Sequence, residues 1–88
     1  MKGKTSTGFK FEIPDEALDD MEVLDALIDL DAGEPSGLKT AMIGLIGADG
    51  RKALYDHCKK ENGRVSAELV MNEFKEIMEA MPKSAKNS

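Results

Sequence analysis

The stretch that decides the fold is PDEALDDMEVLDALIDLDAG, residues 14–33. Its apolar residues recur at helical spacing and predict a buried stripe made of Leu18, Met21, Leu24, Leu27 and Ile28. The rest of its surface is acidic, and residues 13–33 contain no Lys, Arg or His. We therefore predict an amphipathic helix that begins at Pro14 or, alternatively, at Asp19 or Asp20.

The composition limits what the whole chain can be. Its 88 residues suffice for one domain with a modest core, and the net charge of −5 argues against binding to a phosphate backbone. A single cysteine, Cys58, excludes an internal disulfide framework and suits a reducing cytoplasm. Residues 1–11 lack the apolar segment of a signal peptide, and no apolar run is long enough to cross a membrane.

Three more helices are expected, which makes the predicted fold class all-α with about four short helices. They cover residues 38–46, 51–60 and 66–81, with a break at residues 47–50 and Ser66 as the N-cap of the last helix. Gly44 either weakens its helix or permits a close contact with another one. The residues expected to face inward are Leu38, Ala41, Met42, Leu45, Ile46, Leu54, His57, Cys58, Ala67, Val70, Met71, Phe74, Ile77, Met78 and Met81.

The N-terminal part is expected to differ from this helical domain. Residues 1–8 are mostly Lys, Gly, Ser and Thr and predict a mobile lead-in. Phe9, Phe11 and Ile13 alternate with charged residues, which predicts a short strand or an extended arm. Such a strand would need another copy of the chain as its partner. The expected organisation is thus a lead-in and arm at 1–13, a helical domain at 14–82 and a polar tail at 83–88.

Three kinds of chemical site are disfavoured by the residues present. Residues 61–66 resemble half of an EF-hand loop, but Cys58, Lys60 and Leu69 would stand where calcium needs carboxylates. Residues 46–49 resemble an acyl carrier signature, yet Gly50 replaces the serine that carries the prosthetic group. His57 and Cys58 are adjacent, and neighbours on a helix do not face each other. We therefore expect no metal, no cofactor and no enzymatic activity.

The methionines suggest an adaptable binding surface. Methionine repacks easily against varied apolar partners, and the chain has six Met against three Phe and one Tyr. We predict that Met42, Ile43, Met78 and Met81 form part of a partner-binding groove; the alternative is that they fill the core.

Four segments, in their order and spacing, give the chain a family resemblance. They are FEIP with LDDME (11–14 and 18–22), DAGEP (31–35), LIG with ALYDHC (45–47 and 53–58), and ENGRVS with FKEIMEA and KNS (61–66, 74–80 and 86–88). From about residue 11 to its end the chain resembles the tail assembly chaperones of long-tailed bacteriophages, the shorter of the two products usually made from that locus. In many relatives an aromatic residue stands where Met21 is found here.

The resemblance implies a non-enzymatic role in the host cytoplasm. Such proteins bind the tape measure protein, keep it soluble, help to recruit tail tube subunits and leave before the tail is complete. A longer form is commonly made by ribosomal frameshifting, and the family has no shared catalytic residues. Self-association is compatible with this role. The alternative is a small acidic helical adaptor that binds a host protein.

Overall fold

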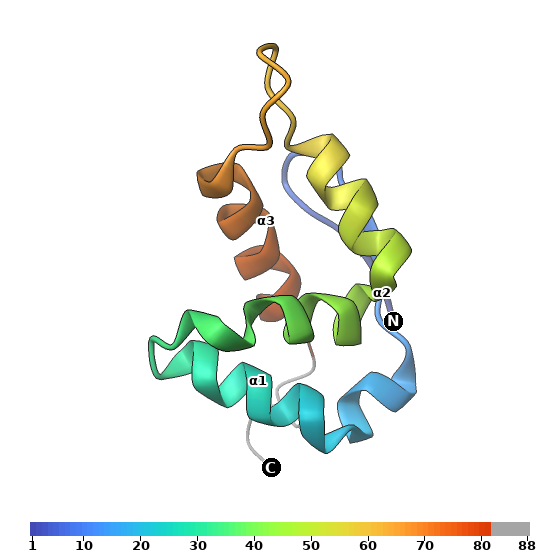
Figure 1. The fold of residues 1–88 in the computed structure, drawn as a ribbon. Coiled ribbons are helices and arrows are strands. Elements are labelled where there is room, and N and C mark those ends of the chain that lie inside the picture. The colour runs from blue at the N-terminus through green and yellow to red at the C-terminus, as the bar shows by residue number, and fades with distance from the viewer. Residues whose placement is uncertain (82–88) are drawn as a thin grey trace.

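The computed structural model describes residues 1–81, so the helix stop expected at Pro82 and the tail expected at 83–88 lie outside the described residues. Within 1–81 the chain is mostly helical, with a small strand pair at its start (Figure 1). The elements are β1 (Lys2–Lys4), β2 (Lys10–Glu12), the 3₁₀ helix η1 (Asp15–Asp19), α1 (Met21–Asp31), the 3₁₀ helix η2 (Pro35–Gly37), α2 (Leu38–His57) and α3 (Ala67–Glu79). The predicted helical class is confirmed, but three α-helices are found in this part of the chain rather than four.

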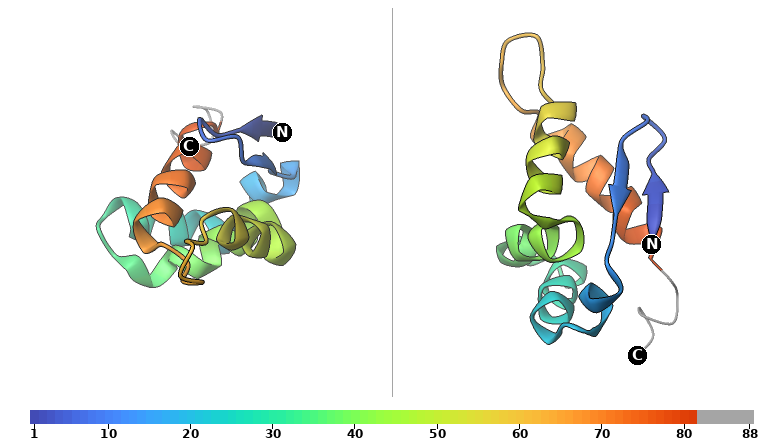
Figure 2. Two further views of the ribbon diagram at one scale, coloured as in Figure 1. Left: turned by 90° about the horizontal axis from the view of Figure 1, so that it is seen from above. Right: turned by 90° about the vertical axis from the view of Figure 1, so that its right-hand side faces the viewer.

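The segment predicted as a mobile lead-in, residues 1–8, contains strand β1. This strand pairs antiparallel with β2, with Gly3 opposite Phe11, and the amide of Thr5 donates to the carbonyl of Phe9 at 2.9 Å. The alternation that predicted a strand is confirmed, since Phe9, Phe11 and Ile13 are all buried. The partner strand comes from the same chain, so the strand does not need a second copy. The hairpin lies against α3 and the end of α2 (Figure 2).

Helix α1 begins later than the prediction from Pro14. Residues 15–19 form η1, and Asp20 then caps α1 through its side chain, which accepts from the amides of Glu22 (2.9 Å) and Val23 (3.4 Å). A carboxylate at this position satisfies amides that have no partner within the helix. The alternative start at Asp20 is therefore confirmed.

The face that α1 buries is also not the predicted one. Val23 and Ala26 are buried, whereas Met21 and Ile28 from the predicted stripe are exposed. The reason lies in α2, where a Cβ atom placed on Gly44 would collide with the side chain of Val23. Gly44 thus permits a close contact between the helices at Val23.

Helix α2 joins the two helices expected at 38–46 and 51–60. It is interrupted at Gly47, whose φ of 78° and ψ of 168° are non-helical and lie in a region that favours glycine. The chain turns sharply at this point, so that the first half of α2 lies along α1 and the second half runs beside the hairpin (Figures 1 and 2). The expected break is therefore present, but it takes one residue rather than four and the helix resumes at once.

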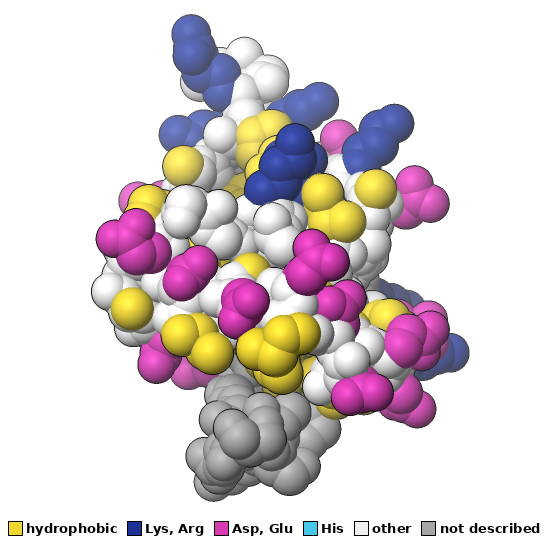
Figure 3. Space-filling model, turned by 60° about the horizontal axis from the view of Figure 1, so that its bottom comes forward, with side chains coloured by type: hydrophobic (Ala, Val, Ile, Leu, Met, Phe, Trp, Pro, Cys, Tyr) yellow, Lys and Arg dark blue, Asp and Glu magenta, His cyan; other side chains and the backbone are white. Residues whose placement is uncertain are grey.

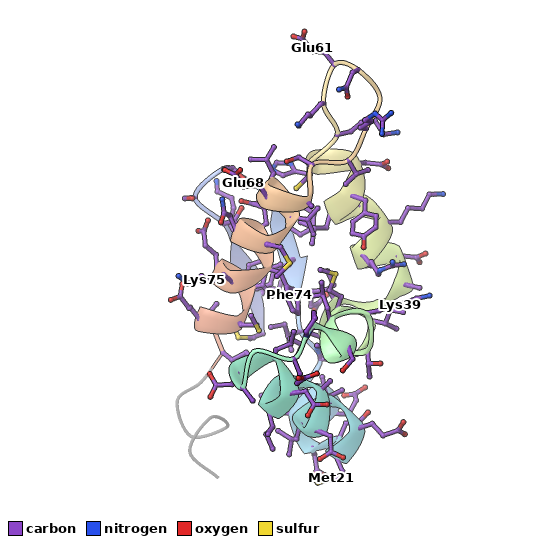
Figure 4. All side chains as sticks on the ribbon, turned by 60° about the vertical axis from the view of Figure 1, so that its left-hand side comes forward. Met21, Lys39, Glu61, Glu68, Phe74 and Lys75 are labelled. Atoms are coloured by element: carbon purple, nitrogen blue, oxygen red, sulfur yellow. The ribbon has the colours of Figure 1, made fainter. Side chains whose placement is uncertain are left out.

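Helix α3 follows its predicted pattern most closely. The hydroxyl of Ser66 accepts from the amide of Leu69 at 3.2 Å, which confirms the predicted cap. Phe74 and Ile77 have no exposed surface, and Phe74 points from α3 into the interior (Figure 4). Ala67 and Met71, which were expected in the stripe, are exposed. The largest fully buried side chains are Phe74, Ile13, Met42, Leu45, Leu54, Ile77 and Cys58.

Candidate partner-binding surface

Helix α1 carries more apolar residues than one buried face can hold. Seven of its eleven residues are apolar, whereas a helix on a protein surface usually has a single apolar stripe. The inward face holds the buried Val23 and Ala26, with Leu27 and Leu30 packed against the core. The remaining apolar residues are Met21, Leu24 and Ile28, and they form a second stripe that the fold does not cover.

This second stripe is the most exposed apolar feature of α1. Met21 is 61% exposed and Ile28 is 62% exposed, while Leu24 between them is partly buried. Their spacing of three and four residues places them on one side of the helix. Met21, labelled in Figure 4, projects away from the rest of the protein. We call Met21, Leu24 and Ile28, together with the acidic residues Glu22, Asp25 and Asp29, the α1 outer face.

The apolar part of this surface is a source of binding energy. Full burial of a Met or Ile side chain contributes about 1.5–3 kcal/mol relative to its exposed state. The folded chain alone gains little of this from Met21 and Ile28, because more than half of each side chain remains exposed. A partner that covered both side chains would gain it instead.

The surroundings of the stripe are strongly negative. Glu22, Asp25 and Asp29 are exposed and lie along one edge of the stripe, since they follow Met21 at one, four and eight residues. The ion pairs found within residues 1–81 join His57 to Glu73 and Lys59 to Asp56, so none of them neutralises α1. Figure 3 shows this side of the molecule, with hydrophobic side chains set among Asp and Glu.

The four residues predicted to form a partner groove are distributed differently. Met42 is fully buried and Met81 is only 7% exposed, so both belong to the core. Met78 is partly buried against that core, and Ile43 is 39% exposed on α2. Of the predicted set, the fold therefore offers Ile43 and part of Met78 to a partner, whereas Met21 and Ile28 were missed because they were assigned to the core.

A polar cluster joins the hairpin turn to α3 and to the end of α2. The carboxylate of Glu73 is buried and accepts from the hydroxyls of Thr5 (2.7 Å) and Thr7 (2.8 Å). The Thr7 oxygen also lies 2.9 Å from Nε2 of His57. Nearby, the amide and hydroxyl of Ser6 both donate to the carboxylate of Glu76, at 2.9 and 2.8 Å. These bonds hold the turn of the hairpin in place.

Thr7 stands at the centre of this cluster. Its hydroxyl lies within hydrogen-bond distance of both Glu73 and Nε2 of His57, and the protonation state of the His57 ring decides which atom of the Thr7–His57 pair donates. In either case the contacts join the hairpin turn to α2 and α3.

Cys58 lies beside the same cluster and is the other reactive side chain of this region. It is 1% exposed and forms no disulfide. Burial, and secondarily the charge of Glu73, raise the pKa of its thiol. The prediction that Leu54 and Cys58 face inward is confirmed, whereas His57 lies at the surface.

The loop that resembles half of an EF-hand is closed by backbone contacts. Lys59 and Val65 form an isolated antiparallel bridge, and the side chain of Asn62 accepts from the amide of Arg64 at 2.9 Å. Among residues 1–81, no three His, Cys, Asp or Glu side chains come together in a metal-binding group. In the same range, no helix has both the length and the apolar character that crossing a membrane requires.

Comparison with known proteins finds no relative of this chain. A scan against protein-family models and searches of curated proteins and of solved structures each return no match for this chain.

Proposed function

We propose that the protein is a bacteriophage tail assembly chaperone that binds the tape measure protein and keeps it soluble until the tail is assembled. One observation carries this proposal: Met21 and Ile28 are more than half exposed on a helix whose opposite side packs into the fold. Apolar residues in a row at helical spacing suit the binding of another helix. The sequence resemblance supplies the identity of the partner.

The charge of the chain suits this role. A tape measure protein, as the resemblance implies, is long, helical and apolar along its stripes, so it needs its apolar surface covered before assembly. A carrier with a net charge of −5 supplies solubility, and loaded carriers repel one another. An acidic rim around an apolar stripe combines both properties on one helix.

The remaining parts of the proposal follow from the same resemblance. The protein acts in the host cytoplasm, helps to recruit tail tube subunits and is absent from the finished tail. The chain is the shorter product of its locus, and ribosomal frameshifting yields a longer form. Binding and release, rather than a chemical reaction, constitute its activity.

Co-expression with a fragment of a tape measure protein tests the proposal. The fragment should become soluble with the wild-type chain and should remain insoluble with the double variant Met21→Ser, Ile28→Ser. The matched control is Met71→Ser, which removes a 45% exposed methionine from α3 and should leave the fragment soluble. A fragment that stays insoluble with every form of the chain contradicts the proposal.

The residues Ile43 and Met78 remain a second predicted contact surface. Replacing the partly buried Met78 with Glu, and measuring both thermal unfolding and partner binding, separates a contact role from a core role. Weaker binding at an unchanged melting temperature would support a contact role. A lower melting temperature with no selective loss of binding would place Met78 in the core alone.

A small acidic adaptor for a host protein is the alternative function. The α1 outer face would serve such an adaptor equally well, because the surface specifies the chemistry of a partner and not its origin. Purification with one defined host protein, in the absence of any phage protein and dependent on Met21, would favour the adaptor.

A further inference from the structure

We propose that the α1 outer face binds a basic amphipathic helix, with the apolar stripe of that helix on Met21, Leu24 and Ile28 and its Lys or Arg residues beside Asp25 and Asp29. The inference deepens the proposed function and rests on it for the source of the helix, which would be a segment of the tape measure protein. The apolar and acidic residues of α1 specify the chemistry of the partner.

The apolar stripe has the dimensions of a contact between helices. Met21 and Ile28 are seven residues apart, which corresponds to about 10 Å along the helix axis. Two apolar residues on successive turns of a partner helix lie about 5 Å apart along its axis, so both fit within this length, one on either side of Leu24. A strand or an irregular loop does not repeat its side chains at this spacing.

The charges around the stripe select a basic partner. Asp25 and Asp29 are exposed, no recorded ion pair within residues 1–81 involves them, and residues 13–33 contain no basic residue. Lys or Arg residues that flank the stripe of a partner helix would meet these carboxylates at the edge of the contact. An acidic helix with the same stripe would bring like charges together, which opposes its binding.

The same argument disfavours a second copy of the chain as the occupant. Two α1 outer faces packed against each other in a symmetric dimer would place Asp25 and Asp29 near their own equivalents. The exposed basic residues within 1–81 lie on other elements: Lys2, Lys4, Lys10, Lys39, Lys52 and Lys75 are on strands and on α2 or α3, and Lys59, Lys60 and Arg64 are in the loop before α3, at the far end of the molecule from α1 (Figure 1). That loop is not a helix and offers no apolar stripe at helical spacing.

Two synthetic helical peptides with the same Leu stripe test the inference directly. One carries Lys along both sides of the stripe and the other carries Glu at the same positions. Titration calorimetry with the full chain should show binding of the Lys peptide and at least about tenfold weaker binding of the Glu peptide. The difference should narrow at high salt, since exposed charges are screened.

Variants of α1 then locate the binding site. The double variant Met21→Ser, Ile28→Ser should weaken binding of the Lys peptide by about tenfold or more, because it removes the central apolar contacts. The double variant Asp25→Lys, Asp29→Lys should reverse the preference and favour the Glu peptide. Met71→Ser on α3 is the matched control and should bind the Lys peptide as the wild type does.

Several results would overturn the inference. The first is equal binding of both peptides, and the second is unchanged binding of the Lys peptide by the Met21→Ser, Ile28→Ser variant. The third is an oligomer of the chain alone, seen by sedimentation, that dissociates in the Met21→Ser variant. If the tape measure fragment is solubilised by the chain while the Lys peptide is not bound, the inference fails and the proposed function stands. If the Lys peptide is bound at α1 while the fragment stays insoluble, the proposed function fails and the inference stands.

Discussion

Helices α1 and α3 are similar in length but differ in which of their apolar residues they bury. In α3 the large residues Phe74 and Ile77 are fully buried, while Leu69 and Met71 are about half exposed. In α1 the small residues Val23 and Ala26 are buried, whereas the larger Met21 and Ile28 are exposed. The difference shows that α3 places two of its large side chains in the core, whereas α1 buries Val23 and Ala26 and leaves Met21 and Ile28 exposed, as the proposed partner-binding role requires.

Truncation of Phe74 should have the largest effect of the changes considered. Phe74→Ala removes a fully buried ring and should lower the free energy of unfolding by about 3–5 kcal/mol. That is a large share of the about 4–13 kcal/mol expected for a chain of this length. Urea denaturation measures the change, and Met71→Ala on the same helix is the control, with an expected change within about 0.5 kcal/mol. Equal effects of the two variants would refute this division of roles within α3.

The close contact between Gly44 of α2 and Val23 of α1 predicts a change in stability of intermediate size. The sign of this change should reverse when Val23 is shortened. Gly44→Ala should lower stability by about 1–3 kcal/mol through overpacking against Val23, offset by about 1 kcal/mol of helix propensity. In a Val23→Ala background the collision is gone, so the same change should raise stability by up to about 1 kcal/mol. A double-mutant cycle measured by thermal unfolding tests this coupling, and the same sign in both backgrounds would rule it out.

In contrast to the buried residues of α3, the apolar residues of the α1 outer face should contribute little to the stability of the fold. Met21→Ser and Ile28→Ser should each change the free energy of unfolding by no more than about 0.5 kcal/mol, because both side chains are largely exposed. Circular dichroism at increasing urea concentration provides the measurement. A loss comparable to that of Phe74→Ala would mean that α1 uses these residues for its own stability.

The smallest expected effect is the contribution of Cys58, which lies close to Glu73 of α3, to the pH dependence of stability. Burial raises the pKa of this thiol above its ordinary value of 9.0, so above that pH the unfolded chain loses the proton first. The stability contributed by the protonated thiol is therefore present below pH 9.0 and declines as the pH rises further. The unfolding free energy of the wild type should thus fall more steeply over this range than that of Cys58→Ala. Parallel profiles would show that the thiol does not contribute.

The sequence predicted α3 better than it predicted α1, for a physical reason. In α3 the buried Val70, Phe74 and Ile77 share one side, so helical periodicity selects most of the buried face, although Leu69 and Met71 are exposed and Glu73 is buried. In α1 seven of eleven residues are apolar, and periodicity cannot choose between two sides. The choice depends on Gly44, which lies in another helix and permits the close contact at Val23.

Two other features were hard to predict from local patterns. Strand β1 has the sequence Lys-Gly-Lys, without an apolar residue that would mark it, and only the alternation at β2 signals that a partner strand is needed. The break at Gly47 was expected, but its length depends on a backbone conformation that the sequence does not specify. The candidate site shared this difficulty, because exposure of Met21 and Ile28 follows from packing between helices.

The sharp turn at Gly47 has a consequence for how this small protein can diversify. The φ and ψ angles of Gly47 set the direction of the first half of α2, which lies along the acidic helix α1, relative to the second half, which runs beside the hairpin. A side chain at position 47 would disfavour the positive φ, so this position favours glycine. Both halves of α2 contribute to one core, through Leu45 before the turn and Leu54 after it, so the acidic end cannot change direction without repacking that core.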